Sequence, residues 1–173
     1  MQKSLGRAFI FSLIAFVLVG FIFVIIAYSI GGAIDILFGL FTDYPGTIIQ
    51  WLLRPVRYFP WDIINKISMT SYISTKTWYV GMFLSLIIAS IVAGLIGGNM
   101  KNSFGGWVLT MIFSIIMYII PLSLGGQYTN NTCGLCTSQE AIIMVIIIGI
   151  VHLLIFGCIT LLTALMIGRA KNY

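Results

Sequence analysis

Two kinds of residue in this sequence could carry chemistry: a cysteine pair and a single histidine. Cys133 and Cys136 are separated by two residues and come just before an apolar run. That spacing suits a redox-active dithiol, because a short disulfide ring is readily reduced and a nearby helix N-terminus stabilises a thiolate. A plain structural disulfide is the simpler interpretation, and a free or metal-binding pair is the third.

The position of this cysteine motif resembles that in the membrane thiol oxidoreductases of the vitamin K epoxide reductase family. Those proteins are four-helix bundles with a CxxC motif at the start of a span, and the resemblance covers the four residues Cys133-Gly134-Leu135-Cys136. It implies thiol–disulfide exchange at the membrane. The sequence departs from the family in having no second cysteine pair to relay electrons and no recognisable polar quinone pocket, so a thiol-disulfide oxidoreductase is the third of our functional hypotheses.

The only histidine, His152, falls inside the last apolar run, residues 141–167, about 16 Å from the start of that run at 1.5 Å per helical residue. A histidine within a membrane should face protein or a water-filled cavity, where it could relay protons. A neutral imidazole that bonds one backbone carbonyl would instead have a structural role. A lone histidine defines neither a metal nor a haem site, so the sequence predicts no metal and no cofactor. Cys158 is expected to pack as a small apolar residue.

The elements that hold these residues are typical of a membrane protein. Of 173 residues, 60% are hydrophobic and 8% are charged, with a mean hydropathy of +1.11, whereas soluble domains carry about 25% charged residues. Runs of at least 18 apolar residues mark spans, and four are expected over residues 8–30, 79–96, 104–124 and 141–167. The sequence therefore predicts an all-α membrane protein, a bundle of four transmembrane helices forming one domain over residues 1–173.

The connection between the first two spans has a character of its own. Residues 45–68 are rich in Trp, Tyr, Arg and Pro, and their apolar residues approximate one face of a helix. This pattern predicts an amphipathic interfacial segment of one or two short helices along the outer membrane surface, with Trp51, Tyr58 and Trp61 at headgroup level. The loop before the fourth span is polar, lacks Lys and Arg, and contains a glycosylation sequon at Asn130.

The charges indicate topology rather than nucleic-acid binding. The nine basic residues are scattered at helix ends and in one loop, without the stripe that nucleic acids require. With both termini inside, the inner side holds five of them, Lys3, Arg7, Lys101, Arg169 and Lys171, against Arg54, Arg57, Lys66 and Lys76 outside. The sequon and the cysteine pair favour the same orientation. We expect a multi-pass protein of the cell membrane with cytoplasmic termini and the lipid bilayer as its first partner.

Small residues recur every four positions in the second span. The helix-packing stripe consists of Gly81, Ser85, Ala89, Ala93 and Gly97. Such spacing permits close backbone approach, with a crossing angle of about −40°. The third and fourth spans carry stripes of the same interval, namely Gly106, Thr110 and Ser114, and Thr160, Ala164 and Gly168. We therefore expect the second span to contact the third or the fourth unusually closely.

Three functional hypotheses follow. Surplus small-residue stripes, few intramembrane polar groups and no catalytic motif favour a small non-catalytic subunit of a larger membrane complex, contributing helix packing and an outer platform. Its partners would be other membrane subunits or copies of itself. The alternative is a small homo-oligomeric transporter or channel with His152 near its pathway. The thiol oxidoreductase is the third hypothesis.

Overall fold

Four long helices form the molecule. The computed structural model describes residues 4–43, 49, 52–123 and 138–170, and these fold into helices joined by turns. The long helices are α1 (Leu5–Ile30), α5 (Ile73–Gly97), α6 (Met100–Ser123) and α7 (Ser138–Ala170). Each is long and apolar enough to cross a membrane, so the predicted bundle of four transmembrane helices is confirmed.

Short helices occupy the connection between the first two spans, as predicted. They are α2 (Ile34–Asp43), the 3₁₀ turn η1 (Arg54–Arg57) and α4 (Pro60–Met69). Pro60 is the first residue of α4, where its missing N–H has no helical partner to lose. Trp51, which was expected at headgroup level, lies outside the described residues.

The ends of the helices follow from local chemistry. The Ser4 hydroxyl oxygen caps α1 by accepting a 3.3 Å hydrogen bond from the Arg7 backbone N–H. Gly98 ends α5 with a φ of 78°, a left-handed conformation that suits glycine. The Asn99 side chain then accepts a 2.7 Å hydrogen bond from the Asn102 N–H and opens α6. The result is the tight hairpin expected between the second and third spans.

The second span begins six residues earlier than its apolar run predicts, at Ile73 instead of Tyr79. The polar residues of this first part fit a helix because their side chains bond within it: the Thr77 hydroxyl donates to the Ile73 carbonyl at 2.8 Å. Hydropathy finds the lipid-embedded part of a helix and misses such a polar extension.

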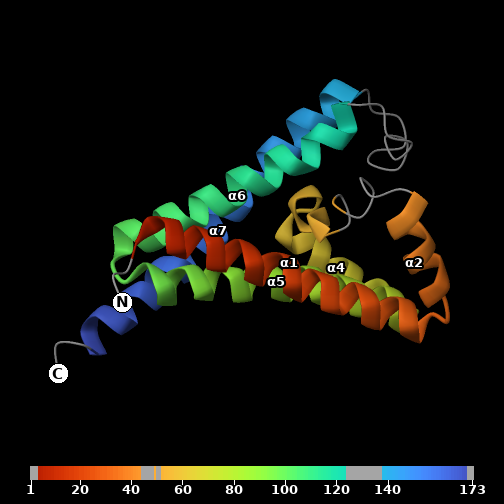
Figure 1. Cartoon of the computed structure of the whole chain (residues 1–173), viewed down its shortest axis with the longest axis horizontal. Helices are drawn as coiled ribbons and strands as arrows, with labels where there is room; N and C mark the ends of the chain where they lie inside the picture. The colour runs from red at the N-terminus through yellow and green to blue at the C-terminus, as the bar shows by residue number, and fades with distance from the viewer. Residues whose placement is uncertain (1–3, 44–48, 50–51, 124–137, 171–173) are drawn as a thin grey trace.

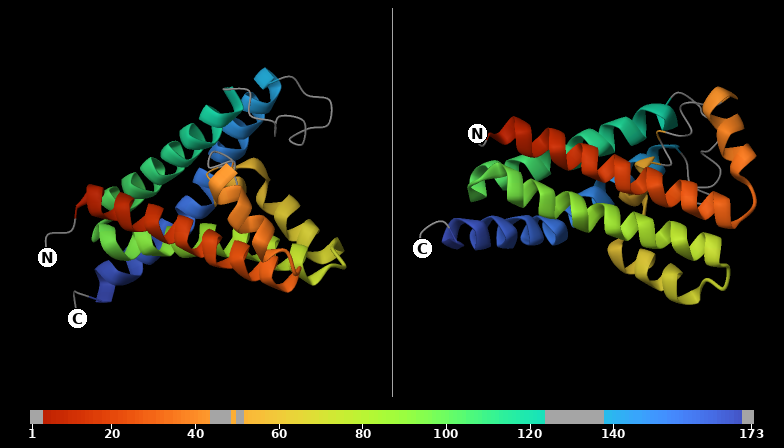
Figure 2. Two further views of the ribbon diagram at one scale, coloured as in Figure 1. Left: turned by 45° about the vertical axis from the view of Figure 1, so that its right-hand side comes forward. Right: turned by 60° about the horizontal axis from the view of Figure 1, so that its bottom comes forward.

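The helices form two arms that meet at one end of the molecule. α1 and α5 lie side by side along their length, whereas α6 and the first half of α7 diverge from them toward the end opposite the termini (Figure 1). α4 runs beside α5, as Figure 2 shows from two further directions. The described ends of α1 and α7 nearest the termini lie at the same end of the bundle, as four spans require.

The small-residue stripe of α5 packs against other helices of the same chain. All five residues are buried. The closest neighbour is α1: a Cβ added at Gly81 would overlap the Phe23 side chain, and the Ser12 hydroxyl donates to the Ala89 carbonyl at 3.0 Å. We expected the third or the fourth span to be this close neighbour. For the central part of the stripe that expectation is wrong, because α1 packs along most of the length of α5.

The opposite side of α5 does contact the fourth span. A Cβ at Gly94 would lie 2.6 Å from the Thr163 Cβ and 2.8 Å from the Thr160 carbonyl oxygen. The Thr160 hydroxyl donates to the Ser90 carbonyl at 3.0 Å. Small residues thus bring two neighbours close to α5, and hydroxyls bond across each contact, a packing mode suited to lipid surroundings.

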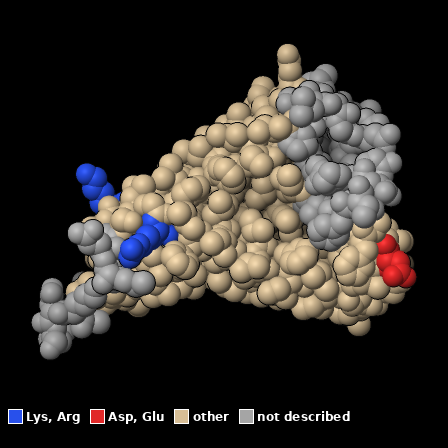
Figure 3. Space-filling view, in the orientation of Figure 1, with Lys and Arg blue, Asp and Glu red and all other residues tan. Residues whose placement is uncertain are grey.

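One face of the molecule carries its charged side chains at the two ends. On the face shown in Figure 3, basic side chains lie near the termini and acidic side chains at the opposite end, with uncharged residues between. Large apolar side chains such as Phe11, Leu18 and Leu154 are exposed along the helices. An uncharged apolar flank between two charged ends is what a protein crossing a bilayer requires.

Candidate functional site

The connection between α1 and α5 enters the bundle and leaves it at the same end. We call residues 52–69 the re-entrant segment. At its inner tip, the Leu52 carbonyl oxygen lies 3.4 Å from the position that a Cβ at Gly20 of α1 would take. Pro55 and Val56 of η1 are buried, and η1 contacts α5, α6 and α7. α4 then returns alongside α5 to Met69.

The tip lies at the middle of the long helices. His152, which bonds the tip, is 14 residues from the first residue of α7, which is about 21 Å along the helix axis. This course differs from that of a helix lying flat on the membrane surface. Pro55 and Pro60 prevent one continuous helix, and burial of Val56 and Ile63 stabilises the inward turn.

His152 anchors the tip. Its Nε2 lies 2.7 Å from the carbonyl oxygen of Tyr58. Because a carbonyl oxygen can only accept, Nε2 carries the proton and Nδ1 is the bare nitrogen. The His152 side chain is completely buried, and Nδ1 has no partner among the described residues. The His152 side chain therefore faces protein and bonds irregular backbone at the tip.

Three basic side chains converge on one aromatic ring. We define the cation cluster as Arg54, Arg57 and Lys66 around Tyr58. The Arg54 and Arg57 guanidinium carbons lie 5.9 and 5.4 Å from the Tyr58 ring centre, and the Lys66 ammonium nitrogen lies 5.6 Å from it. Arg54 also stacks 4.2 Å above the Trp78 ring. Aromatic faces attract cations and let them sit away from bulk water.

Arg54 also bonds the Tyr58 side chain directly. The Arg54 Nη2 donates to the Tyr58 hydroxyl oxygen at 3.4 Å. Basic side chains therefore contact both the ring and the hydroxyl of Tyr58.

A polar cavity of about 470 Å³ lies beside the cluster. We call it the α4 cavity. Its lining combines Tyr58 from the tip with one face of α4 and the turn after it: Asp62, Asn65, Lys66, Met69 and Thr70. Asn65 and Lys66 are exposed, and Asp62 is half-buried. The cavity thus follows α4 from the end of the bundle, at Thr70, inward to Tyr58.

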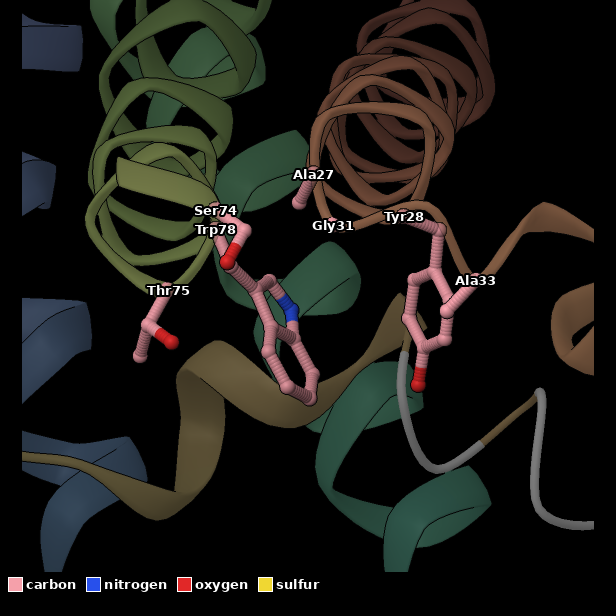
Figure 4. Close-up of a pocket in the computed structure, with 7 residues that line it drawn as sticks. All are labelled: Ala27, Tyr28, Gly31, Ala33, Ser74, Thr75 and Trp78. Atoms are coloured by element: carbon pink, nitrogen blue, oxygen red, sulfur yellow. The ribbon is translucent and has the colours of Figure 1, made fainter. Parts of the chain in front are cut away.

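A second cavity of about 260 Å³ lies between the ends of α1 and α5 that face away from the termini. Tyr28 of α1 and Trp78 of α5 line opposite sides of this cavity, and Ser74 and Thr75 lie nearby (Figure 4). Trp78 presents its ring to Arg54 as well. This second cavity therefore adjoins the cation cluster through one indole ring.

The half of the bundle nearer the termini is closely packed. A Cβ at Gly106 of α6 would lie 2.5 Å from the Ala8 Cβ of α1. The Ser103 hydroxyl of α6 donates to the Gly94 carbonyl of α5 at 3.2 Å. Trp107 of α6 is completely buried and lies beside Phe156 of α7, with 6.3 Å between the ring centres. The residues that line the two cavities described above belong to the other half of the bundle.

The remaining predicted sites have different outcomes. Cys133, Cys136 and Asn130 lie outside the described residues. Cys158 is a free thiol exposed on α7. The expectation that it packs as a small apolar residue is therefore wrong. In the part of the chain that the structure describes, no group of three or more His, Cys, Asp or Glu side chains could hold a metal ion.

Sequence reasoning missed the cation cluster. It assigned Arg54 and Arg57 to the headgroup region, because a helical pattern gives no information on depth. The available signal was the sequence Arg54-Pro55-Val56-Arg57-Tyr58, in which a proline interrupts the amphipathic pattern between two arginines. Trp78 and Tyr79 approach this sequence only through the return of α4 along α5, a tertiary contact that periodicity does not reveal.

Comparison with protein-family models, with the sequences of curated proteins and with solved structures finds no match for this chain.

Proposed function

We propose that this four-helix membrane protein is a non-catalytic binding protein, with a site for a small water-soluble solute formed by the re-entrant segment. The observation that carries the proposal is the course of residues 52–69, which bring Tyr58 to the middle of α7 while the polar α4 cavity leads back to the end of the bundle. Irregular backbone at membrane depth persists where it is buried in protein or lines a water-filled cavity. The re-entrant segment combines both situations.

Ionisable residues at this depth support the same proposal. Charged side chains within a membrane are costly and mark binding sites or pathways more often than structural contacts. Arg54 and Arg57 are half-buried in the tip, close to His152 on the facing helix. Because the packing around Gly94 and Trp107 closes the other half of the bundle, the geometry supports binding from one side of the membrane rather than an open channel.

The expected role as a subunit of a larger membrane complex loses one of the three features that favoured it, the surplus of small-residue stripes. The small residues of α5 are buried, and Gly106 of α6 and Thr160 of α7 make close contacts with other helices of the same chain. A surplus of unpaired stripes would have required a partner. The chain itself supplies the partners for these three helices.

Cysteine accessibility along α4 tests the proposal. In a variant whose three native cysteines are replaced by serine, we compare the neighbouring substitutions Asn65→Cys and Ile64→Cys in proteoliposomes. Both side chains are exposed, but only Asn65 lines the α4 cavity. A membrane-impermeant maleimide should label Asn65→Cys rapidly and Ile64→Cys slowly, because Ile64 faces lipid.

Ile63→Cys serves as the buried control, because Ile63 is completely inaccessible. Labelling of Asn65→Cys as slow as that of Ile63→Cys would show that water does not enter the cavity, and the proposal would be wrong. Equal and rapid labelling of Asn65→Cys and Ile64→Cys would place α4 on the membrane surface, with the same consequence.

A further inference from the structure

The cation cluster identifies the kind of solute that the site would accept. Arg54, Arg57 and Lys66 bring three positive charges within 6 Å of the Tyr58 ring centre. Like charges held this close in a half-buried site repel one another unless an anion compensates them. Arg54 and Lys66 alone carry two of these positive charges, and Asp62 on the cavity wall supplies one negative charge, so these three side chains leave an excess of positive charge.

Arg54 and Lys66 have hydrogen-bonding capacity that the described residues leave unused. Arg54 donates to the Tyr58 hydroxyl through Nη2, but its Nε is buried and has no partner there. Neither Arg54 nor Lys66 forms an ion pair with any described residue. The Lys66 ammonium sits over the rings of Tyr58 and Tyr79, at 5.6 Å from each centre, and keeps its donors.

The types of donor favour an oxyanion of the phosphate kind. A guanidinium presents a planar fork of N–H groups that matches two oxygens of one phosphate, and an ammonium adds a mobile point charge. The Tyr58 hydroxyl accepts from Arg54, and Tyr58 lines the cavity, so its O–H is available to donate a hydrogen bond to an anionic oxygen. A metal cation would be repelled by the same cluster.

We propose that Arg54, Lys66 and Tyr58 bind a phosphate group at the inner end of the α4 cavity. This inference rests on the proposed function, because it requires the cavity to admit a solute. The phosphate group has two chemical sources, inorganic phosphate that enters along the polar face of α4, and the headgroup of an anionic phospholipid. Both present the same oxygens to the same side chains.

Thermal unfolding of the full chain in dodecyl maltoside, in phosphate-free buffer of constant ionic strength, tests this proposal. One arm adds inorganic phosphate in exchange for chloride, and the other adds phosphatidylglycerol. A ligand that binds only the folded state raises the Tm saturably. Lys66→Gln should weaken the apparent affinity about tenfold, the effect of losing one charge-assisted contact. Arg54→Lys, which keeps the charge and loses the fork, should weaken it as well.

Lys101→Gln is the matched control, because Lys101 is exposed at the opposite end of the bundle. A saturable rise in Tm with inorganic phosphate that Lys66→Gln weakens identifies the free anion, and the same result with phosphatidylglycerol alone identifies the lipid. A response that Lys66→Gln and Lys101→Gln reduce equally, or no response to either phosphate source, overturns the inference. If Asn65→Cys is nevertheless labelled rapidly, the inference fails while the proposed binding cavity stands.

Discussion

At the scale of single residues, Tyr58 is the point at which the site is held together. Its carbonyl oxygen accepts from His152, its hydroxyl accepts from Arg54, and its ring meets Tyr79 edge-on at 5.9 Å between centres. Backbone and side chain of one residue thus connect the tip of the re-entrant segment to α7 and to α5. The cation cluster depends on this geometry, because all three cations lie against the same ring.

His152→Leu should destabilise the protein through this contact. The leucine fills the volume but leaves the Tyr58 carbonyl oxygen buried without a donor, which costs about 1–3 kcal/mol. His152→Gln retains an N–H donor and should lose less. The measurement is the Tm of each variant in the same detergent. If His152→Leu unfolds at the wild-type temperature, the hydrogen bond does not hold the tip.

The sequence could predict part of this site. A buried histidine satisfied by one carbonyl was foreseeable, because lipid offers an imidazole no other partner. The identity of that carbonyl was not foreseeable, since Tyr58 and His152 are 94 residues apart in the chain. The cation cluster was missed for a related reason. Lys66 comes near the same ring as Arg54 only because the chain turns at Pro60. A local sequence pattern does not reveal how far into the bundle such a turn lies.

At the scale of helices, close packing around α5 depends on positions without room for a side chain. Gly94 meets Thr163 and Thr160 of α7 at distances that a Cβ could not occupy without displacement. The stripe itself was predictable from its interval of four residues. Its partner was not, because α1, α6 and α7 all carry small or hydroxyl residues that could have matched it, and the choice among them depends on how the helices are connected.

Gly94→Ala should therefore destabilise the bundle by about 1–3 kcal/mol, the usual effect of overpacking. Gly168→Ala in α7 is the matched control, because nothing lies within 4 Å of the added Cβ, and alanine in place of glycine favours a helix by about 0.5–1 kcal/mol. Chemical unfolding in mixed micelles measures both changes. Equal effects of the two substitutions would contradict the close contact between α5 and α7.

A second pair of substitutions tests the contact with α1. Ala89→Leu adds three carbons at a completely buried position, where Ser12 of α1 bonds the backbone. Ile88→Leu changes the adjacent, exposed position at nearly constant volume. We expect a lower Tm for Ala89→Leu and an unchanged Tm for Ile88→Leu. A wild-type Tm for Ala89→Leu would mean that α1 does not approach α5 at this point.

At the scale of the whole molecule, the two ends of the bundle differ. Toward the termini, glycine and serine contacts bring all four helices together, as Gly94, Ser103 and Gly106 show. Toward the other end, α6 and α7 diverge from α1 and α5, and the tip of the re-entrant segment reaches between the helices. One end thus stabilises the bundle, while the site for which we propose solute binding lies toward the diverging end.

The two ends of the bundle should face opposite sides of the membrane. Four spans place both termini and the α5–α6 turn on one side, and α2 and the α4–α5 turn on the other. The sequence assigns five basic residues to the terminal side and four to the other, and the positive-inside rule then predicts that the terminal side is cytoplasmic. In a cysteine-free variant shown to fold by size-exclusion chromatography, Asp35→Cys should react with an impermeant maleimide on intact cells, because Asp35 is exposed and belongs to α2, which lies at the diverging end (Figure 1). Lys101→Cys, exposed at the other end, should react only after the cells are permeabilised.

Reaction of both variants on intact cells would contradict the four-span topology. The reversed pattern would retain that topology and turn the α4 cavity toward the cytoplasm, so the phosphate group that we propose as its ligand would have to come from inside the cell.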